Sequence, residues 1–267
     1  MKKVLMLLFV TVMFCFGQYS QQEIKQLERE CDSGICKSCY SLGFNYNMGS
    51  SGLKKDFDKA DKYFIKNAEC QAKECDSGIC NACYNLGVDY NRGFSGLKKD
   101  FDKADKYFIK HNECQEKECD NNNYAGSCLG VGNRYADGYY GIKKDVKKAA
   151  QYFSKYTQQM DKECNDEGYS CFLLGNFYYY GNQIVKKDTK KATQYFNEHD
   201  KHNKKKCNNG DVDYCYTLSF FYENGGYYGR KVIEPNQNKA LEYHKKVCDL
   251  DPNYYSKFTN TGKSCAK

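Results

Sequence analysis

The chain has 267 residues, with 17 cysteines, 26 tyrosines, two prolines and no tryptophan, and its formal net charge is +7. Its 41 basic residues are spread along the chain and mixed with 34 acidic ones, which indicates solvated helix faces and excludes a nucleic-acid-binding stripe. The scarcity of proline, together with glycine at regular intervals, favours helices joined by short turns.

The first residues have the layout of a secretory signal peptide, which we expect to span residues 1–17. Lys2 and Lys3 precede an apolar run from Val4 to Phe16, and Cys15 and Gly17 take the −3 and −1 positions of a cleavage site. This run is shorter than the ~20 residues that a membrane-spanning helix needs. A lipoprotein acylated on Cys15 is the alternative, but the residues just before that cysteine are large rather than small. We therefore expect a secreted, extracellular or periplasmic protein that has no membrane contact after cleavage and begins with a helical cap at residues 18–30.

A unit of about 44 residues then recurs through the chain. Residues 31–74 return almost unchanged at 75–118, and weaker copies occupy 119–163, 164–206 and 207–250, before a tail at 251–267. One small residue aligns the copies at spacings of 44, 45, 43 and 44: Gly43, Gly87, Gly132, Gly175 and Ser219. A repeat of this length indicates supersecondary units that bury their apolar faces by stacking.

The first half of each copy predicts an amphipathic helix. Three residues after the small position every copy has a tyrosine: Tyr46, Tyr90, Tyr135, Tyr178 and Tyr222. Six residues after it every copy has a glycine: Gly49, Gly93, Gly138, Gly181 and Gly225. In the first copy Cys39, Leu42, Gly43 and Tyr46 fall on one helical face. We expect the small residue to allow close approach of a neighbouring helix, and the later glycine to end the helix in the left-handed conformation.

The second half of each copy predicts another helix. Lys-Lys-Asp precedes it in four copies, with the aspartate at Asp56, Asp100, Asp145 and Asp188, and Asn236 takes that position in the fifth. Aspartate and asparagine are preferred N-cap residues. A Lys-Ala pair follows, with the alanine at Ala60, Ala104, Ala149, Ala192 and Ala240, and then an aromatic pair such as Tyr63-Phe64. We expect the alanine to be a close-contact point and the aromatic residues to form the core.

These residues resemble the Sel-one-like repeat, a relative of the tetratricopeptide repeat marked by Leu-Gly-x-x-Tyr-x-x-Gly and then Gly-x-x-x-Asp-x-x-Lys-Ala. The resemblance covers residues 31 to about 250. It implies an all-α fold, an α/α right-handed superhelix (a solenoid) of five helix pairs. Cysteines eight residues apart across the repeat junctions are similar to those of the exported, cysteine-rich branch of that family, in which disulfides cross-link the pairs.

The second helices depart from the usual length of such a repeat. The spacing from the Lys-Ala alanine to the next junction cysteine is 15 residues in four copies, as from Ala60 to Cys75, but 8 from Ala240 to Cys248. Seven residues make about two helical turns. We therefore interpret the extra length as more helix and not as a new domain.

Removal of the signal peptide leaves sixteen cysteines, which in an exported chain favours disulfides. The repeat implies five junction pairs: Cys31–Cys39, Cys75–Cys83, Cys119–Cys128, Cys164–Cys171 and Cys207–Cys215. The symmetric proposal for the two near-identical copies is Cys36–Cys70 and Cys80–Cys114, which leaves Cys248 with Cys265. The pairing of these last six cysteines stays open. Zinc is the competing chemistry, because Cys36-x-x-Cys39 and Cys80-x-x-Cys83 have ligand spacing, but duplication of the repeat also explains this duplication, so we expect no bound metal and no cofactor.

The resemblance also implies an enzymatic alternative, because the exported branch is associated with β-lactam binding and weak β-lactamase activity. The chain has S-x-x-K at Ser51, Ser95 and Ser264, but neither S-D-N nor K-T-G accompanies it. The histidines His111, His199, His202 and His244 are too scattered for a metallo-β-lactamase, and we place His199 and His202 on a solvated helix face. No catalytic residue can be assigned.

A binding function requires fewer specific residues than an enzymatic one. Stacked helix pairs leave a concave groove lined by the exposed side of the first helices. We expect this groove at the positions two and five residues after the small one: Asn45, Met48, Asp89, Arg92, Arg134, Asp137, Phe177, Tyr180, Phe221 and Asn224. These residues vary between copies, which suits recognition of a protein, an extended peptide or a glycan such as a peptidoglycan fragment, although simple solvent exposure explains the variation equally well. We expect a monomeric interaction module, with a β-lactam-binding protein as the alternative and an inhibitor of a host protein as a third option.

Overall fold

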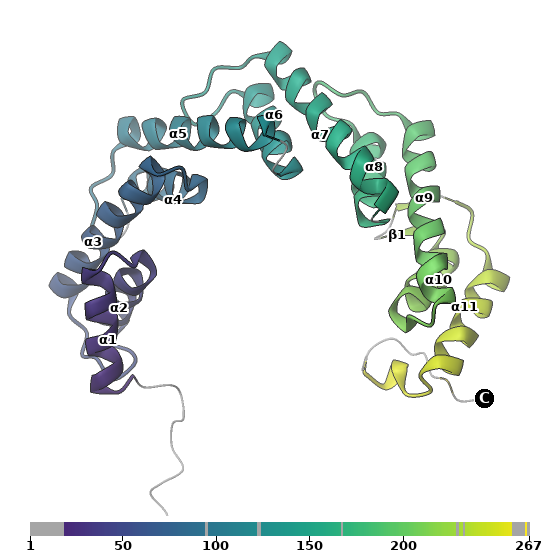
Figure 1. Cartoon of the computed structure of the whole chain (residues 1–267), viewed down its shortest axis with the longest axis horizontal. Helices are drawn as coiled ribbons and strands as arrows, with labels where there is room; N and C mark the ends of the chain where they lie inside the picture. The colour runs from purple at the N-terminus through teal and green to yellow at the C-terminus, as the bar shows by residue number, and fades with distance from the viewer. Residues whose placement is uncertain are drawn as a thin grey trace, which may run out of the picture. The chain divides into compact units, whose positions relative to one another are not determined.

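The computed structural model describes residues 19–93, 96–121, 124–166, 168–227, 230–231, 233–257 and Cys265. The expected signal peptide lies outside these ranges. In the described part the chain is helical, apart from a ladder of two two-residue strands (Figure 1). None of the described helices has the length and apolar character required to cross a membrane.

The chain forms two compact units: Met1–Glu118 with Asp137–Lys144, and Cys119–Ala136 with Asp145–Lys267. The helices of the first unit are α1 (Gln21–Asp32), α2 (Cys36–Met48), α3 (Phe57–Asp76), α4 (Cys80–Arg92) and α5 (Phe101–Asp120). The elements of the second unit are α6 (Ala125–Asp137), α7 (Val146–Asp166), α8 (Gly168–Tyr180), α9 (Thr189–Asn208), α10 (Val212–Asn224), β1 (Gly226–Tyr227), β2 (Arg230–Lys231), α11 (Gln237–Leu250) and the 3-10 helix η1 (Tyr254–Lys257).

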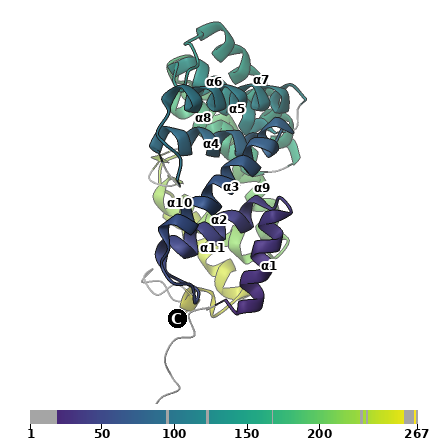
Figure 2. The same ribbon diagram turned by 90° about the vertical axis from the view of Figure 1, so that its left-hand side faces the viewer.

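Each copy of the repeat is a helix pair. The first helices are α2, α4, α6, α8 and α10, and the second helices are α3, α5, α7, α9 and α11. In the first unit α2 packs against α1 and α3, and α3 packs against α4 (Figure 2). In the second unit α8 packs against α7 and α9, and α10 packs against α9 and α11. The prediction of an all-α protein built from five helix pairs is confirmed.

The small residue of each first helix faces the phenylalanine of the second. A Cβ atom added at Gly43 would lie 2.6 Å from the ring of Phe64, so only glycine allows this approach. The same contact recurs in three other copies: Gly87 with Phe108, Gly132 with Phe153, and Gly175 with Phe196. In the fifth copy Ser219 donates a hydrogen bond to the Ala240 carbonyl (3.1 Å), and His244 replaces the phenylalanine. These phenylalanines are 1–5 % exposed, and burying each contributes about 1.5–3 kcal/mol to folding.

The ends of the helices follow the sequence prediction. Gly49 ends α2 at φ +66°, and the equivalent glycines of the other copies have φ between +62° and +72°, a conformation that costs glycine little. The Asp56 carboxylate accepts the backbone N–H of Lys59 at the start of α3 (3.0 Å). Asp100, Asp145, Asp188 and Asn236 cap the other second helices in the same way.

A pair of stacked tyrosines joins the two helices of every copy. The ring centroids of Tyr46 and Tyr63 are 5.7 Å apart, and the rings are nearly parallel. The equivalent pairs are Tyr90–Tyr107, Tyr135–Tyr152, Tyr178–Tyr195 and Tyr222–Tyr243. The ammonium group of Lys59 lies 5.2 Å from the Tyr46 centroid, and the lysine of every other Lys-Ala pair lies over the equivalent tyrosine. The Lys-Ala motif therefore contributes a cation–π contact as well as a small packing residue.

The second helices differ in length as expected from the cysteine spacing. α3, α5 and α9 each have 20 residues and α7 has 21, whereas α11 has 14. The extra residues continue the helix, so that prediction is confirmed.

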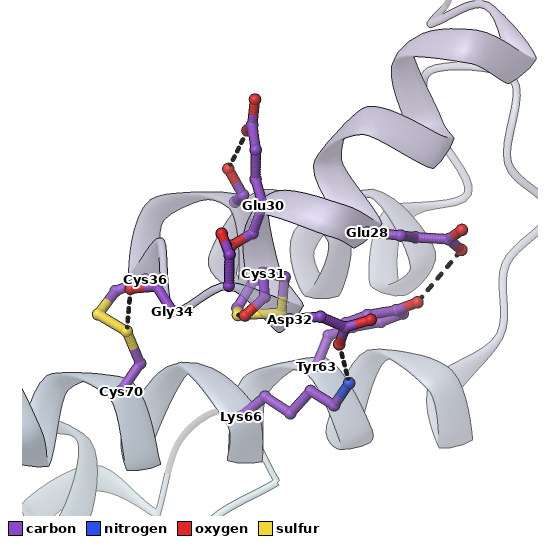
Figure 3. The surroundings of a disulfide bond; sticks show 12 residues. Glu28, Glu30, Cys31, Asp32, Gly34, Cys36, Tyr63, Lys66 and Cys70 are labelled. Atoms are coloured by element: carbon purple, nitrogen blue, oxygen red, sulfur yellow. Dashed lines mark hydrogen bonds and ion pairs between the residues drawn. A yellow bond between two sulfur atoms is a disulfide. The ribbon is translucent and has the colours of Figure 1, made fainter.

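Disulfides join sixteen cysteines of the described part in eight pairs, which are the five junction pairs implied by the repeat and three pairs among the six cysteines whose pairing the sequence left open. Four of them link the end of one helix pair to the first helix of the next, and Cys31–Cys39 links α1 to α2 in the same way. Cys36–Cys70 and Cys80–Cys114 link the two helices within a copy, and Cys248–Cys265 holds the tail. Figure 3 shows the Cys36–Cys70 bridge between α2 and α3, with the Lys66–Asp32 ion pair nearby. A disulfide framework of this density is typical of proteins in oxidising, extracytoplasmic environments.

Candidate binding sites between neighbouring helix pairs

The structure separates the residues predicted to line a groove into two groups. At the position two residues after the small one, Asn45, Arg134 and Phe221 are buried, with 7 %, 9 % and 3 % of their surface exposed. The expectation that these three face solvent was wrong: Phe221, for instance, belongs to the hydrophobic core of the second unit. Asn45, for example, accepts hydrogen bonds from the hydroxyls of Ser50 and Ser51 at 2.8 Å each.

Five residues after the small position the side chains are exposed in all five copies: Met48, Arg92, Asp137, Tyr180 and Asn224. Met48 and Tyr180 each expose 58 % of their surface, which is high for large apolar or aromatic side chains. Asp89 and Phe177, from the first group, are half-buried.

The first unit contains a cavity of about 740 Å³ between α2, α3 and α4, here called the α3 cavity. Its lining comprises Cys36, Lys37, Tyr40, Asn67, Gln71, Glu74, Tyr84, Asn85, Val88, Asp89 and Arg92. Only Asp89 and Arg92 were predicted as binding residues. The others were missed, since the repeat pattern marks the end of α3 only as additional helix and does not indicate which side chains face a cavity.

Two amide side chains of α3 line this cavity without satisfying their oxygen atoms. Asn67 is 2 % exposed, and its Oδ1 is buried and has no hydrogen-bond partner. Gln71, one helical turn further, has a buried Oε1 that likewise has no partner. A buried acceptor without a partner costs about 1–3 kcal/mol. Both residues line the cavity, and a donor that reached either oxygen would remove this cost, although the two oxygen atoms are buried beneath the cavity lining.

The carboxylates of the α3 cavity come from two helices. Glu74 continues the helical face of Asn67 and Gln71, and Asp89 approaches from α4. Burial raises the pKa of Asp89 from 3.8 to about 6, and the nearby Arg92 cation opposes this rise. Glu74 and Asp89 are half-buried, whereas Lys37 and Arg92 are exposed, so the acidic groups lie deeper than the basic ones.

The second unit contains a cavity of about 420 Å³, here called the α9 cavity. Its lining comprises Asp166, Gly168, Tyr169, Phe172, His199, His202, Asn203, Lys206, Tyr214 and Thr217. The two cavities use equivalent positions of the repeat, because His199, Asn203 and Lys206 of α9 correspond to Asn67, Gln71 and Glu74 of α3 when Ala192 is aligned with Ala60.

The histidines of the α9 cavity are not on a solvated face, so that expectation was wrong. His199 Nδ1 donates to the Gly168 carbonyl at 2.8 Å, and its Nε2 accepts from Asn203 at 3.1 Å. His202 Nε2 donates to the Cys164 carbonyl at 3.0 Å. Burial lowers the pKa of His199, although its hydrogen bond to Gly168 opposes the shift. Carbonyl groups of Gly168 and Cys164 fix the orientation of the two rings, which hydropathy patterning does not reveal.

The serine and cysteine motifs have other partners. Ser51 adopts φ +55° and donates its hydroxyl hydrogen to the amide oxygen of Asn45, an acceptor that cannot serve as a general base. Ser95 and Ser264 lie outside the described residues. Cys36 and Cys39 belong to different disulfides, so this C-x-x-C pair offers no thiolate to zinc.

These features define a disulfide-cross-linked, all-α repeat protein. The family model for the Sel1 repeat matches residues 36–70, 80–110, 125–156, 168–198 and 213–252, more than half of the chain. The chain belongs to the Sel1 repeat family, whose repeats typically form protein-interaction modules. No curated protein matches it by sequence.

Several solved structures resemble the chain at low identity. A Sel1 repeat protein from Oxalobacter formigenes is 22% identical, with a TM-score of 0.38 over 88% of this chain and 82% of that one. The protective antigen c5321 of uropathogenic Escherichia coli, which has an SLR fold, is 18% identical, with a TM-score of 0.26 over 88% and 68%. The immunity protein Pa5087 from Pseudomonas aeruginosa is 17% identical, with a TM-score of 0.30 over 90% and 80%.

Proposed function

We propose that this chain is an exported protein-interaction module that binds a peptide or an extended protein segment through the exposed side of its first helices. One observation carries the proposal. Five chemically different side chains, Met48, Arg92, Asp137, Tyr180 and Asn224, are exposed at the same position of the five copies, while the packing residues of those copies are nearly constant. Chemical variation at an exposed position of a nearly constant helical frame is suited to recognition.

Export is supported by two independent features. The first seventeen residues have the charge and apolar pattern of a signal peptide, and the disulfides need an oxidising compartment to form. The bridges also favour binding, because a rigid frame loses less conformational entropy when a ligand binds. Hydrolysis of β-lactams is not part of the proposal, since Ser51 is hydrogen-bonded to an amide oxygen.

Selection from a phage-displayed library of random linear peptides, with oxidised residues 18–267 as the bait, tests the proposal. We expect the selected peptides to share a consensus, and Arg92→Ala with Tyr180→Ala to weaken their binding at least tenfold, which corresponds to about 1.4 kcal/mol. The matched control changes two exposed lysines of second helices, Lys62→Ala and Lys106→Ala, and should leave binding unchanged.

Two results would count against this function. Absence of any consensus would remove the interaction module as the working account. Displacement of the selected peptides by a peptidoglycan fragment would reassign the surface to a glycan.

A further inference from the structure

We propose that the α3 cavity binds the guanidinium group of an arginine side chain in a partner peptide. This inference rests on the proposed function, because it names the chemistry that one part of the interaction module recognises. The cavity belongs entirely to the first unit, between α2, α3 and α4.

The added length of α3 builds this cavity. Gln71 and Glu74 lie 11 and 14 residues after Ala60, whereas in the last copy the junction cysteine Cys248 comes only 8 residues after Ala240. The short second helix therefore has no counterpart of these two residues. The seven additional residues continue the helix and also bring an amide and a carboxylate beside the next first helix.

The polar side chains that line the cavity favour a ligand that donates several hydrogen bonds. Asn67 Oδ1 and Gln71 Oε1 are buried and without a partner, and the carboxylates of Glu74 and Asp89 are acceptors when ionised. A guanidinium group is planar and carries five N–H donors in a fixed arrangement, so it can satisfy more of these acceptors at once than an ammonium group can.

Charge and aromatic residues favour the same ligand. The half-buried Glu74 and Asp89 lie deeper than the exposed Lys37 and Arg92, so a cation that enters the cavity meets the carboxylates at close range while the basic side chains remain in solvent. Tyr40 and Tyr84 also line the cavity and are 43 % and 41 % exposed. Their ring faces can stack on a guanidinium plane.

The equivalent α9 cavity provides an internal contrast. Lys206 occupies the position of Glu74, and His199 and Asn203, in place of Asn67 and Gln71, are hydrogen-bonded to each other. The acceptors that define the α3 cavity are thus replaced by a cation and by groups that already have partners. We expect no guanidinium binding there.

The test is an NMR titration of the oxidised protein with N-acetyl-arginine methylamide, compared with the neutral isostere N-acetyl-citrulline methylamide. We expect saturable shifts of the Asn67 and Gln71 side-chain amide signals with the arginine compound, and at least tenfold weaker binding of the citrulline compound. Signals from the α9 cavity should not move.

Two variants and one control assign the site. Glu74→Gln and Asp89→Asn should each weaken binding of the arginine compound several-fold, and together at least tenfold. Glu118→Gln changes the half-buried glutamate at the equivalent position of the next copy, where His111 is hydrogen-bonded to the Cys80 carbonyl, and should have no effect. Unchanged backbone amide spectra establish that the variants are folded.

Equal binding of the citrulline compound, absence of saturable shifts, or equal loss in Glu118→Gln would overturn the inference. The titration and the peptide selection distinguish failure of this inference from failure of the proposed function. If displayed peptides share a consensus but the arginine compound does not bind, the module stands and this site does not. If the arginine compound binds but no peptide is selected, the cavity has the stated chemistry and the proposed function is wrong.

Discussion

At the scale of single residues, the sequence predicts the side chains that repeat and misplaces those that vary. The glycines, the N-cap aspartates and the aromatic residues recur in at least four of the five copies, and each has one steric or hydrogen-bonding role that follows from its type. Asn45 and Arg134 are polar and variable, so the pattern indicated exposure, yet both are buried. His199 lies among charged residues in the sequence, but its ring is held by the Gly168 carbonyl. A polar side chain is buried when another segment supplies its hydrogen-bond partner. The residue pattern of one helix does not reveal such a partner.

The pKa of Asp89 provides a direct test of how burial changes the ionisation of a cavity residue. Burial raises its pKa from 3.8 to about 6, so the neutral carboxyl is more favourable in the folded chain than in the unfolded one. The stability that the neutral form contributes is therefore present below pH 3.8 and lost as the pH rises through about 6. A two-unit shift corresponds to about 3 kcal/mol when fully expressed. For a half-buried group we expect Asp89→Asn to raise the free energy of unfolding by about 1 kcal/mol at pH 7.5 and by nothing measurable at pH 4.

Titration of the Asp89 carboxyl carbon by NMR checks this prediction directly. The midpoint should lie near pH 6 and move upward in Arg92→Ala, because the Arg92 cation lowers the pKa of Asp89. The charged groups that line the same cavity are Lys37, Glu74 and Arg92. A midpoint near pH 4, or a downward shift in the arginine variant, would contradict the stated cause.

At the scale of elements, one position of the long second helices joins each of them to the preceding segment, by a disulfide in two copies and by a hydrogen bond in the other two. Ten residues after the Lys-Ala alanine, Cys70 and Cys114 form disulfides with Cys36 and Cys80. At the same position Gln159 donates to the Cys119 carbonyl (3.4 Å), and His202 donates to the Cys164 carbonyl (3.0 Å). The sequence predicted the length of these helices from cysteine spacing, but not this shared role, because neither glutamine nor histidine resembles cysteine in a pattern.

The strength of this connection should differ between copies. Replacing Cys36 and Cys70 together by serine opens a loop of 34 residues and should cost about 4 kcal/mol in the chain-entropy account of disulfides. His202→Ala removes one hydrogen bond from a half-buried donor and should cost about 1 kcal/mol. Hydrogen exchange measured by mass spectrometry, helix by helix, gives the local opening free energies of α3 and α9.

The matched control is the Cys80 and Cys114 pair, which has the same separation of 34 residues. Its double serine variant should lower the protection of α5 by as much as the first double variant lowers that of α3. A cost for His202→Ala equal to that of either disulfide would mean that loop closure is not what these bridges contribute.

At the scale of the whole molecule, the repeat made the fold predictable and left the binding sites open. Five aligned copies identify the helices, their caps and the family, because residues with the same packing or capping role occur at equivalent positions of the copies. The cavities form where one helix pair packs against the first helix of the next, as at Gln71 and Glu74 in α3. The shape of each cavity depends on how neighbouring helix pairs pack. Neither the signal-peptide pattern nor the number of cysteines contains information about this packing.

The last prediction concerns the covalent state of the mature chain. The apolar run at Val4–Phe16 predicts cleavage after Gly17, so that Cys15 leaves with the signal peptide. All remaining cysteines are paired in the structure. We therefore expect the mature chain to begin at Gln18, to contain no thiol that reacts under denaturing, non-reducing conditions, and to gain sixteen mass units on full reduction, one for each of its sixteen cysteines, at about one mass unit per hydrogen added. Intact mass spectrometry with and without reductant measures all three. A lipid mass on a chain that begins at Cys15 would establish the lipoprotein alternative, and reactive thiol on an otherwise mature chain would show that the disulfide framework is incomplete in the cell.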